Sequence, residues 1–346
     1  MKNLKKLSEF AAPSGFERKL GEYLSEEFKR TKSVKSVYRD RIGNIYAEIP
    51  GKSKRKMIVA AHMDEIGLMV NYISDKGFIK FITIGGIVAD ILPNTLVRIL
   101  GEKKEILGVI GVNPPHAASS GKKEIKDLFI DTGLTKEKIE KAGIGLGTPI
   151  VFETSFSNND NVYIGKAFDD RIGCAVLLHI AQEIKKVPDY TILLVASVQE
   201  EVGTRGAQVV SLSNEADCAV IFEGTFAMDY PGNSPDDWTS YFGGGPAFTL
   251  MDGTMVSDRG FIKEIENIAQ NRKIKYQYKQ PRNAGGTDAG KLHLSKNGMP
   301  CAVIAAPCRY IHSSYSLLNK HDYESMKKLG VVICEDMKSE IIEKIF

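Results

Sequence analysis

Four apolar runs of the chain are each followed by side chains that can bind a metal ion or carry a proton. The runs occupy residues 57–61, 191–198, 218–222 and 301–305. The side chains that follow them are His62, Asp64, Glu200, Glu201, Glu223 and, beyond a short loop, His312. Imidazoles and carboxylates together form a mixed nitrogen and oxygen ligand set, which suits zinc, cobalt or manganese.

The apolar runs have the length of strands and are continuous enough to be buried on both faces of a sheet. In an open α/β sheet, ligands bind beyond the carboxyl ends of the strands, so we expect the side chains after the runs to share one crevice. Asp169 and Asp170 open a predicted helix and are expected at the same place. Carboxylates in a shared low-dielectric site repel one another unless a positive charge compensates them. A pair of divalent cations supplies that charge.

Each part of this set also has a simpler structural interpretation. A histidine and an aspartate two positions apart occur by chance in many sequences. The paired aspartates suit the N-cap and first turn of a helix, where the helix dipole favours acidic side chains. The paired glutamates suit a solvated strand end, and the last histidine suits a loop. Their joint placement after four apolar runs favours the metal site.

The elements around these residues predict an α/β fold. Helical patterns lie at residues 170–184, at 256–271 and from 322 to the C-terminus. Because they alternate with the apolar strands, we expect a central mixed, mostly parallel sheet with helices on both faces. Ser14 and Glu17 have the spacing of a capping box, which predicts a helix that begins there and ends near Phe28.

Residues from about 71 to 164 have a different pattern, with short β-type runs separated by glycine and proline. This pattern predicts a small β-barrel inserted into the α/β fold. We therefore divide the chain into a catalytic α/β domain, residues 1–70 and 165–346, and an inserted barrel, residues 71–164. His116 in the insert keeps two interpretations: a histidine that faces the active site of its own or a neighbouring subunit, and an exposed loop histidine.

Composition narrows the possible partners and location. The 46 Lys and Arg residues nearly balance 43 Asp and Glu, and no long block of one sign occurs, so neither a nucleic acid nor a membrane is expected as a partner. No run reaches the roughly 18 apolar residues of a membrane span, and charged residues interrupt the N-terminus, so we expect a soluble, cytoplasmic protein. Five cysteines without a CxxC pair indicate reduced thiols.

Several longer motifs occur together in a characteristic order. They are AHMDEIGLMV, GKAFDDRIGCAV, SVQEEVGTRGA, the EGT after CAVIF, GGTDAGKLHL and RYIHS. In order and approximate spacing, the chain resembles the dinuclear metallo-aminopeptidases of the glutamyl-aminopeptidase and tetrahedral-aminopeptidase family, some of which carry an endoglucanase or fructose-operon label. The resemblance extends over essentially the whole chain.

The resemblance implies a role for each residue of the set. Asp169 would bridge two divalent ions, zinc with cobalt or manganese as alternatives, with a water between them. Glu201 and His312 would complete one metal site, and His62 and Glu223 the other. Glu200 matches the family's general base. Asp64 matches the residue that orients the His62 ring, as second-shell carboxylates do.

A glycine-rich segment resembles the family's substrate-side loop. Gly286, Thr287 and Asp288 belong to it, and glycines there permit close approach of a backbone to the substrate. The alternative is a glycine turn in which Asp288 caps the next helix.

Three functions remain in competition at this stage. The leading one is a two-metal aminopeptidase that removes N-terminal residues from peptides and assembles as a homo-oligomer, with a dodecamer implied by the resemblance. A carbohydrate hydrolase needs two carboxylates but neither histidine nor metal. A non-catalytic, metal-stabilised assembly protein is the third, and the presence of Glu200, which ligates nothing in this scheme, argues against it.

Overall fold

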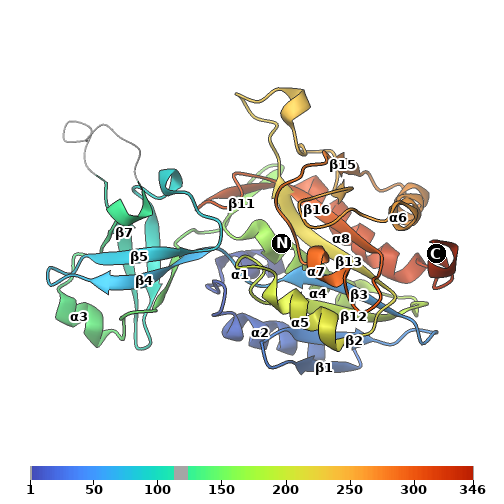
Figure 1. The fold of residues 1–346 in the computed structure, drawn as a ribbon, viewed down its shortest axis with the longest axis horizontal. Helices are drawn as coiled ribbons and strands as arrows, with labels where there is room; N and C mark the ends of the chain where they lie inside the picture. The colour runs from blue at the N-terminus through green and yellow to red at the C-terminus, as the bar shows by residue number, and fades with distance from the viewer. Residues whose placement is uncertain (1, 113–123, 346) are drawn as a thin grey trace.

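The computed structural model describes residues 2–112 and 124–345, which form two bodies of unequal size (Figure 1). The larger body is an α/β domain built on an 11-stranded mixed sheet. The smaller body is a closed antiparallel β-barrel whose strands lie between β3 and β10 in the chain. The predicted α/β fold with an inserted barrel is confirmed.

The large sheet is parallel at its centre and antiparallel at its edges. Its strands are β1 (Ser36–Arg39), β2 (Ile45–Ile49), β3 (Lys56–His62), β10 (Ser157–Asn159), β11 (Val162–Gly165), β12 (Thr191–Ser197), β13 (Cys218–Phe226), β14 (Ala247–Thr249), β15 (Gln277–Lys279), β16 (Cys301–Arg309) and β17 (Ser316–Asn319). The order is β1-β2-β12-β3-β13-β16-β17-β11-β10, with β14 beside β16 and β15. Parallel pairs join β12, β3, β13 and β16, whereas β2 and β17 pair antiparallel with this centre. The parallel part is therefore narrower than expected.

Helices cover both faces of the large sheet. They are α1 (Lys2–Glu9), α2 (Arg18–Lys29), α4 (Phe168–Glu183), α5 (Arg205–Ser213), α6 (Arg259–Asn271), α7 (Ala289–Leu292), α8 (Lys320–Asp336) and α9 (Ile341–Ile345). In β3, Met57 and Val59 belong to the core under α2, α4 and α8, whereas Ile58 and Ala60 pack with residues of α5 and α7. Alternate side chains of one strand thus enter two cores, which explains its uninterrupted apolar sequence.

The barrel has its own apolar core. Its strands are β4 (Gly67–Ile73), β5 (Ile79–Ile84), β6 (Leu96–Leu100), β7 (Glu105–Ile110), β8 (Ile130–Asp131) and β9 (Pro149–Phe152), in the closed order β4-β5-β8-β7-β6-β9, with α3 (Lys136–Lys141) outside. Leu68, Phe81 and Ile99 are among the side chains that fill it. The division of the chain at residues 71 and 164 stays a proposal, and His116 lies outside the described residues.

Two helix predictions need correction. The capping box is wrong: α2 begins at Arg18, Glu17 makes no side-chain cap, and Ser14 bonds to Asp64 instead. The C-terminal helix is interrupted, because α8 ends at Asp336 and the extended backbone of Met337 turns that side chain into the core.

Two expectations about composition can be compared with the structure. All five cysteines are free and buried, as expected for reduced thiols. Among the helices in residues 2–112 and 124–345, none has both the length and the apolar character needed to cross a bilayer.

Candidate active site

The residues that follow the apolar runs meet at the carboxyl ends of the central strands. His62 is the last residue of β3, and Glu200 and Glu201 lie in the loop after β12. Glu223 lies within β13, and His312 lies in the turn between β16 and β17. Because β12, β3, β13 and β16 are parallel neighbours, their carboxyl ends share one edge of the sheet.

Asp169, in the first turn of α4, joins the two histidines. One of its carboxylate oxygens lies 3.1 Å from His62 Nε2 and the other lies 3.3 Å from His312 Nε2. Glu223 Oε2 is 3.5 Å from His62 Nε2, and Glu201 Oε1 is 3.3 Å from His312 Nε2. The structure thus contains two histidine–glutamate pairs connected by the two oxygens of one aspartate.

The donor atoms lie close enough to hold a metal ion. Two sets have ligand atoms within 4.8 Å of one another: His62, Asp169 and Glu201, and His62, Asp170 and Glu223. Glu201 Oε1 is buried and accepts no hydrogen bond from the described residues, as expected for an atom whose partner is a cation. Asp170 differs, because its oxygens accept hydrogen bonds from the backbone amides of His62 and Gly173. The donor chemistry therefore fits a divalent cation, and Asp170 supports the backbone around it.

Burial shifts the protonation of this cluster. It raises the pKa of Glu201 to about 7 and that of Glu223 to about 8, and it raises the pKa of Glu200 well above its usual range. Burial opposes the charge of His312, but the hydrogen bond to Asp169 and the charge of Glu201 raise its pKa to about 9. Without a cation the cluster therefore retains protons, which a bound divalent ion would displace.

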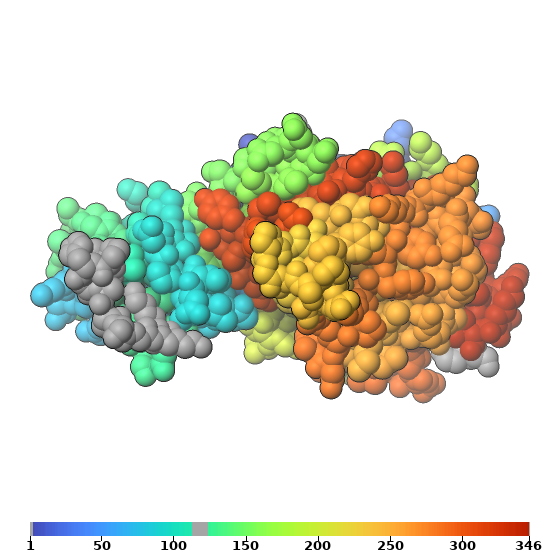
Figure 2. All heavy atoms as spheres, turned by 90° about the horizontal axis from the view of Figure 1, so that it is seen from above, coloured from blue at the N-terminus to red at the C-terminus, as the bar shows by residue number. Residues whose placement is uncertain are grey.

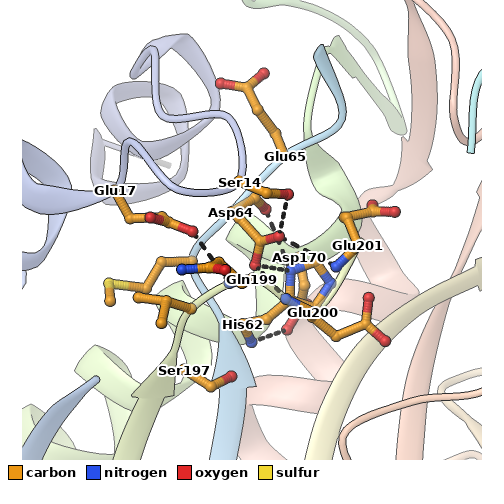
Figure 3. A network of polar contacts seen from close by, with 12 residues as sticks. Ser14, Glu17, His62, Asp64, Glu65, Asp170, Ser197, Gln199, Glu200 and Glu201 are labelled. Atoms are coloured by element: carbon orange, nitrogen blue, oxygen red, sulfur yellow. Dashed lines mark hydrogen bonds and ion pairs between the residues drawn. The ribbon is translucent and has the colours of Figure 1, made fainter. Parts of the chain in front are cut away.

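Asp64 holds several parts of the site in place (Figure 3). Its backbone carbonyl lies 3.2 Å from His62 Nδ1 and its Oδ1 lies 3.3 Å from the same nitrogen, and Oδ1 also accepts a hydrogen bond from the Glu200 amide at 3.0 Å. Its Oδ2 accepts hydrogen bonds from the Glu201 amide at 3.1 Å and from the Ser14 hydroxyl at 2.6 Å. One buried carboxylate therefore orients a histidine ring and also fixes the loop that carries both glutamates.

The loop before α2 supports the same network. Glu17 Oε1 accepts hydrogen bonds from the Gly15 amide at 2.8 Å and the Gln199 amide at 3.0 Å, and burial raises its pKa to about 6. Sequence reasoning missed this role, because Ser14 and Glu17 are adjacent to a helix in the chain and far from their partners. The SxxE spacing was the available signal, and it indicated a cap instead.

A cavity of about 740 Å³ opens over the donor cluster. Glu200 lines it, together with Gly286 and Thr287 of the expected substrate-side loop. Asp288 does not line it: this residue is 1% exposed, accepts a hydrogen bond from the Ser197 hydroxyl and makes no side-chain cap on α7. Asp288 thus occupies the N-cap position of α7 without the expected side-chain cap, and its place in a substrate-side loop stays a proposal.

A lysine in the cavity was also missed from the sequence. Lys279 ends β15 and lines the cavity, and no described carboxylate lies within 4.0 Å of its ammonium group. Asp252 also lines the cavity, but one of its oxygens accepts the Thr254 and Met255 amides and the other is buried. Nothing in the sequence around Lys279 distinguishes it from the other lysines of the chain.

An open α/β sheet that presents paired histidines and carboxylates beyond its central strands is an arrangement typical of metal-dependent hydrolases. The family model for M42 glutamyl aminopeptidases matches residues 43–329. The chain therefore belongs to the M42 glutamyl aminopeptidase family, whose members are metallopeptidases.

Individual relatives agree with this assignment. The chain is 32% identical over 306 residues to the lysyl aminopeptidase of Pyrococcus furiosus, covering 86% of each chain. It is 33% identical to the TET aminopeptidase of Thaumarchaeota archaeon SCGC AB-539-E09, with a TM-score of 0.95 over 100% of this chain and 98% of the other. The Pyrococcus horikoshii TET1 peptidase, which assembles into a tetrahedron or a large octahedral shell, is 27% identical, with a TM-score of 0.85 and coverage of 97% and 99%.

Proposed function

We propose that this aminopeptidase binds two divalent cations, zinc with cobalt or manganese as alternatives, and removes N-terminal residues from peptides. The observation that carries the proposal is the position of Asp169, whose two oxygens each face a different histidine. In this proposal His62 and Glu223 hold one ion, Glu201 and His312 hold the other, and Asp169 bridges them. Bound ions of this kind polarise a peptide carbonyl and lower the pKa of water.

Glu200 is the proposed proton carrier. Its side chain lines the cavity beside the proposed ligands. Its backbone is held by the hydrogen bond from its amide to Asp64. Its carboxylate, once ionised beside the bound cations, would be placed to take a proton from the attacking water and give it to the leaving amine. Asp64 serves as a positioning residue, because it holds His62 Nδ1 and leaves Nε2 free to ligate.

Metal removal tests this assignment. We expect about two ions per chain by elemental analysis, and loss of peptide hydrolysis after chelation with recovery on adding Zn²⁺. Peptides with a blocked N-terminus should resist cleavage. Full activity in a demonstrably metal-free preparation would contradict the two-ion mechanism. Cleavage of a β-linked glucan but not of peptides would support the carbohydrate alternative, and metal binding without either activity would support the assembly alternative.

We further propose that the site prefers an acidic N-terminal residue. The cationic side chains that line the cavity outside the ligand cluster are Lys279 and the exposed Arg282. Asp252 lines it as well, with one oxygen that accepts the Thr254 amide and one that is buried and accepts no hydrogen bond from the described residues. A substrate carboxylate could therefore pair with Lys279, whereas a substrate lysine would meet like charge. This agrees with the glutamyl activity in the family's description and differs from the lysyl activity of the Pyrococcus furiosus relative.

The preference is testable by substrate competition and one substitution. We expect kcat/KM to be higher for peptides that begin with Glu than for those that begin with Lys or Leu. Lys279→Met should lower kcat/KM for the Glu peptide by about 10–100-fold, the value of one charged contact, and change the Leu peptide little. Lys275→Met removes an exposed lysine that bonds only to the Gly243 carbonyl, and it serves as the control. An equal fall for Glu and Leu peptides would contradict the proposal.

A further inference from the structure

One loop of the barrel reaches the candidate metal site. It lies between β5 and a short 3₁₀ turn (Ala89–Ile91), and it includes Gly85 and Gly86. The Gly86 carbonyl lies 3.0 Å from His312 Nδ1. A neutral imidazole that donates from Nδ1 to this carbonyl presents its Nε2 lone pair to Asp169 and Glu201. The barrel backbone therefore determines which nitrogen of His312 is available to a metal.

The two glycines touch both ligands of the same proposed ion. A Cβ atom on Gly86 would lie 3.2 Å from His312 Nδ1, and one on Gly85 would lie 3.3 Å from the Cβ of Glu201. Gly85 also has φ +81°, a backbone conformation that favours glycine. The close approach of the loop thus depends on the absence of side chains at both positions.

This loop is fixed to the barrel rather than to the α/β domain. The loop continues directly from barrel strand β5, and Ile87 after it packs against the barrel core. A second bond joins the inserted segment to the turn that carries His312, because the Thr154 hydroxyl donates to the Ser314 carbonyl at 2.6 Å. In Figure 2 the red segment that precedes α8 lies against the cyan atoms of the barrel, in agreement with these contacts.

The other proposed ion has no such connection. His62 is held by Asp64 and ends a central strand, and Glu223 lies within the neighbouring strand β13. Both belong to the α/β domain, and within residues 2–112 and 124–345 neither side chain forms a hydrogen bond or an ion pair with the barrel loop. Asp64 of the α/β domain therefore supports both halves of the cluster, and the barrel loop adds a second support to the half that contains His312.

We propose that the inserted barrel is a structural part of the metal site formed by Glu201 and His312, with the Gly86 carbonyl and the Thr154 hydroxyl as its positioning groups. The inference rests on the proposed pairing of these ligands. Its consequence is that movement of the barrel changes the affinity for one ion and leaves the other nearly unchanged. Anything that docks on the barrel, including a second copy of this chain, would then be linked to metal occupancy by the same free energy.

Zn²⁺ titration of the metal-free full-length chain tests the proposal. Gly86→Ala inserts a methyl group against His312 at a position whose φ does not require glycine. We expect the Zn²⁺-binding step that His312→Ala weakens to lose about 10–100-fold in affinity in Gly86→Ala as well. This is the usual effect of disturbing a group that orients a metal ligand. The other binding step should stay unchanged. Gly145→Ala is the matched control, because a Cβ there has open space in the same inserted segment. His312→Ala identifies which step belongs to this site.

The remaining outcomes are informative as well. Circular dichroism and light scattering should show that Gly86→Ala keeps the fold and the assembly of the parent. If it does not, Thr154→Val provides the second test, because it removes the bond to Ser314 while nearly conserving volume. Unchanged Zn²⁺ affinity in a folded Gly86→Ala, or equal loss at both steps, overturns the proposal. Since the readout is binding, a failure of the aminopeptidase mechanism would appear separately, as two intact Zn²⁺ steps without peptide hydrolysis.

Discussion

At the scale of single residues, neighbouring glutamates in one loop have different environments. Both line the cavity, but Glu201 Oε1 faces His312 Nε2 at 3.3 Å and accepts no hydrogen bond from the described residues, whereas Glu200 forms no ion pair with either histidine among those residues. Their backbone amides bond to different oxygens of Asp64, which fixes the loop between them. The two proposed roles, metal ligand and proton carrier, thus depend on where each glutamate side chain points more than on residue type.

Substitution of each glutamate by glutamine should separate these roles. Glu200→Gln keeps the volume and the loop bonds but removes the basic carboxylate, so kcat should fall by about 10²–10⁴-fold with metal content and KM nearly unchanged. Glu201→Gln should lose metal, because a neutral amide is a poor ligand for zinc. Elemental analysis and steady-state kinetics measure both effects. Equal metal loss in the two variants, or near-normal turnover in Glu200→Gln, would require another proton acceptor.

The sequence predicts which side chains gather at the edge of the sheet but not the residues behind them, and their roles as ligands stay a proposal. His62, Asp169 and His312 could be inferred because they lie beside apolar strands whose ends must meet in a parallel sheet. Ser14 and Lys279 could not, because their partners are distant in the chain and their residue types are common on surfaces. The spacing of Ser14 and Glu17 is also that of a helix cap, so the sequence predicted a local role in place of their contacts with distant residues.

At the scale of elements, a buried ionic cluster connects the N-terminal helices to the link between the two domains. Glu65 accepts an ion pair from Lys166 at 2.5 Å and from Arg171 at 3.2 Å, and all three side chains are nearly inaccessible. Arg171 also donates to the backbone carbonyls of Leu7 and Phe10, which fixes the end of α1 over α4. These contacts hold β3, α1 and α4 together immediately behind the metal ligands.

Removing the negative charge of this cluster should destabilise the fold. Glu65→Gln keeps the shape but leaves two buried cations without a counter-charge, so we expect the free energy of unfolding of the metal-free protein to fall by about 3–5 kcal/mol. Denaturant unfolding measures this change. Glu22→Gln, which breaks an exposed pair with Arg18, should stay within about 0.5 kcal/mol of the parent. A similar small change for both variants would mean that Glu65 is not the compensating charge.

At the scale of the whole molecule, the hydrophobic pattern and the positions of glycine and proline were sufficient to predict the architecture. Uninterrupted apolar runs predicted strands buried on both faces, and β3 indeed contributes alternate side chains to two cores. The antiparallel edges were harder to predict, because β17 and β11 are short and owe their pairing to long-range contacts. The closeness of the barrel loop to His312 could not be predicted either, since it depends on how two domains pack.

The barrel also leaves apolar side chains exposed, which bears on assembly. Ile82 and Leu107 on its strands are 48% and 52% exposed. One TET1 relative forms a dodecamer, and the Pyrococcus horikoshii TET1 peptidase assembles into a tetrahedron or a large octahedral shell. We propose that the barrel mediates association between copies. Deleting the insert from residue 71 onward would cut through β4, so point substitutions on the barrel surface test the proposal more cleanly.

The size of the Leu107→Asp assembly, measured by light scattering, tests this proposal. A charge in an apolar interface between copies loses its solvation without gaining a partner, so the variant should form a smaller species than the parent at the same concentration. Leu212→Asp, at a 73% exposed position on α5 of the α/β domain, is the matched control and should keep the parent's size. If Leu212→Asp dissociates the assembly and Leu107→Asp does not, the α/β domain mediates association.

The same variant tests whether assembly and metal binding are linked. Because the Gly85–Gly86 loop connects the barrel to His312, dissociation through Leu107→Asp should also weaken one Zn²⁺-binding step. An unchanged Zn²⁺ titration in a dissociated variant would show that assembly and metal binding are independent.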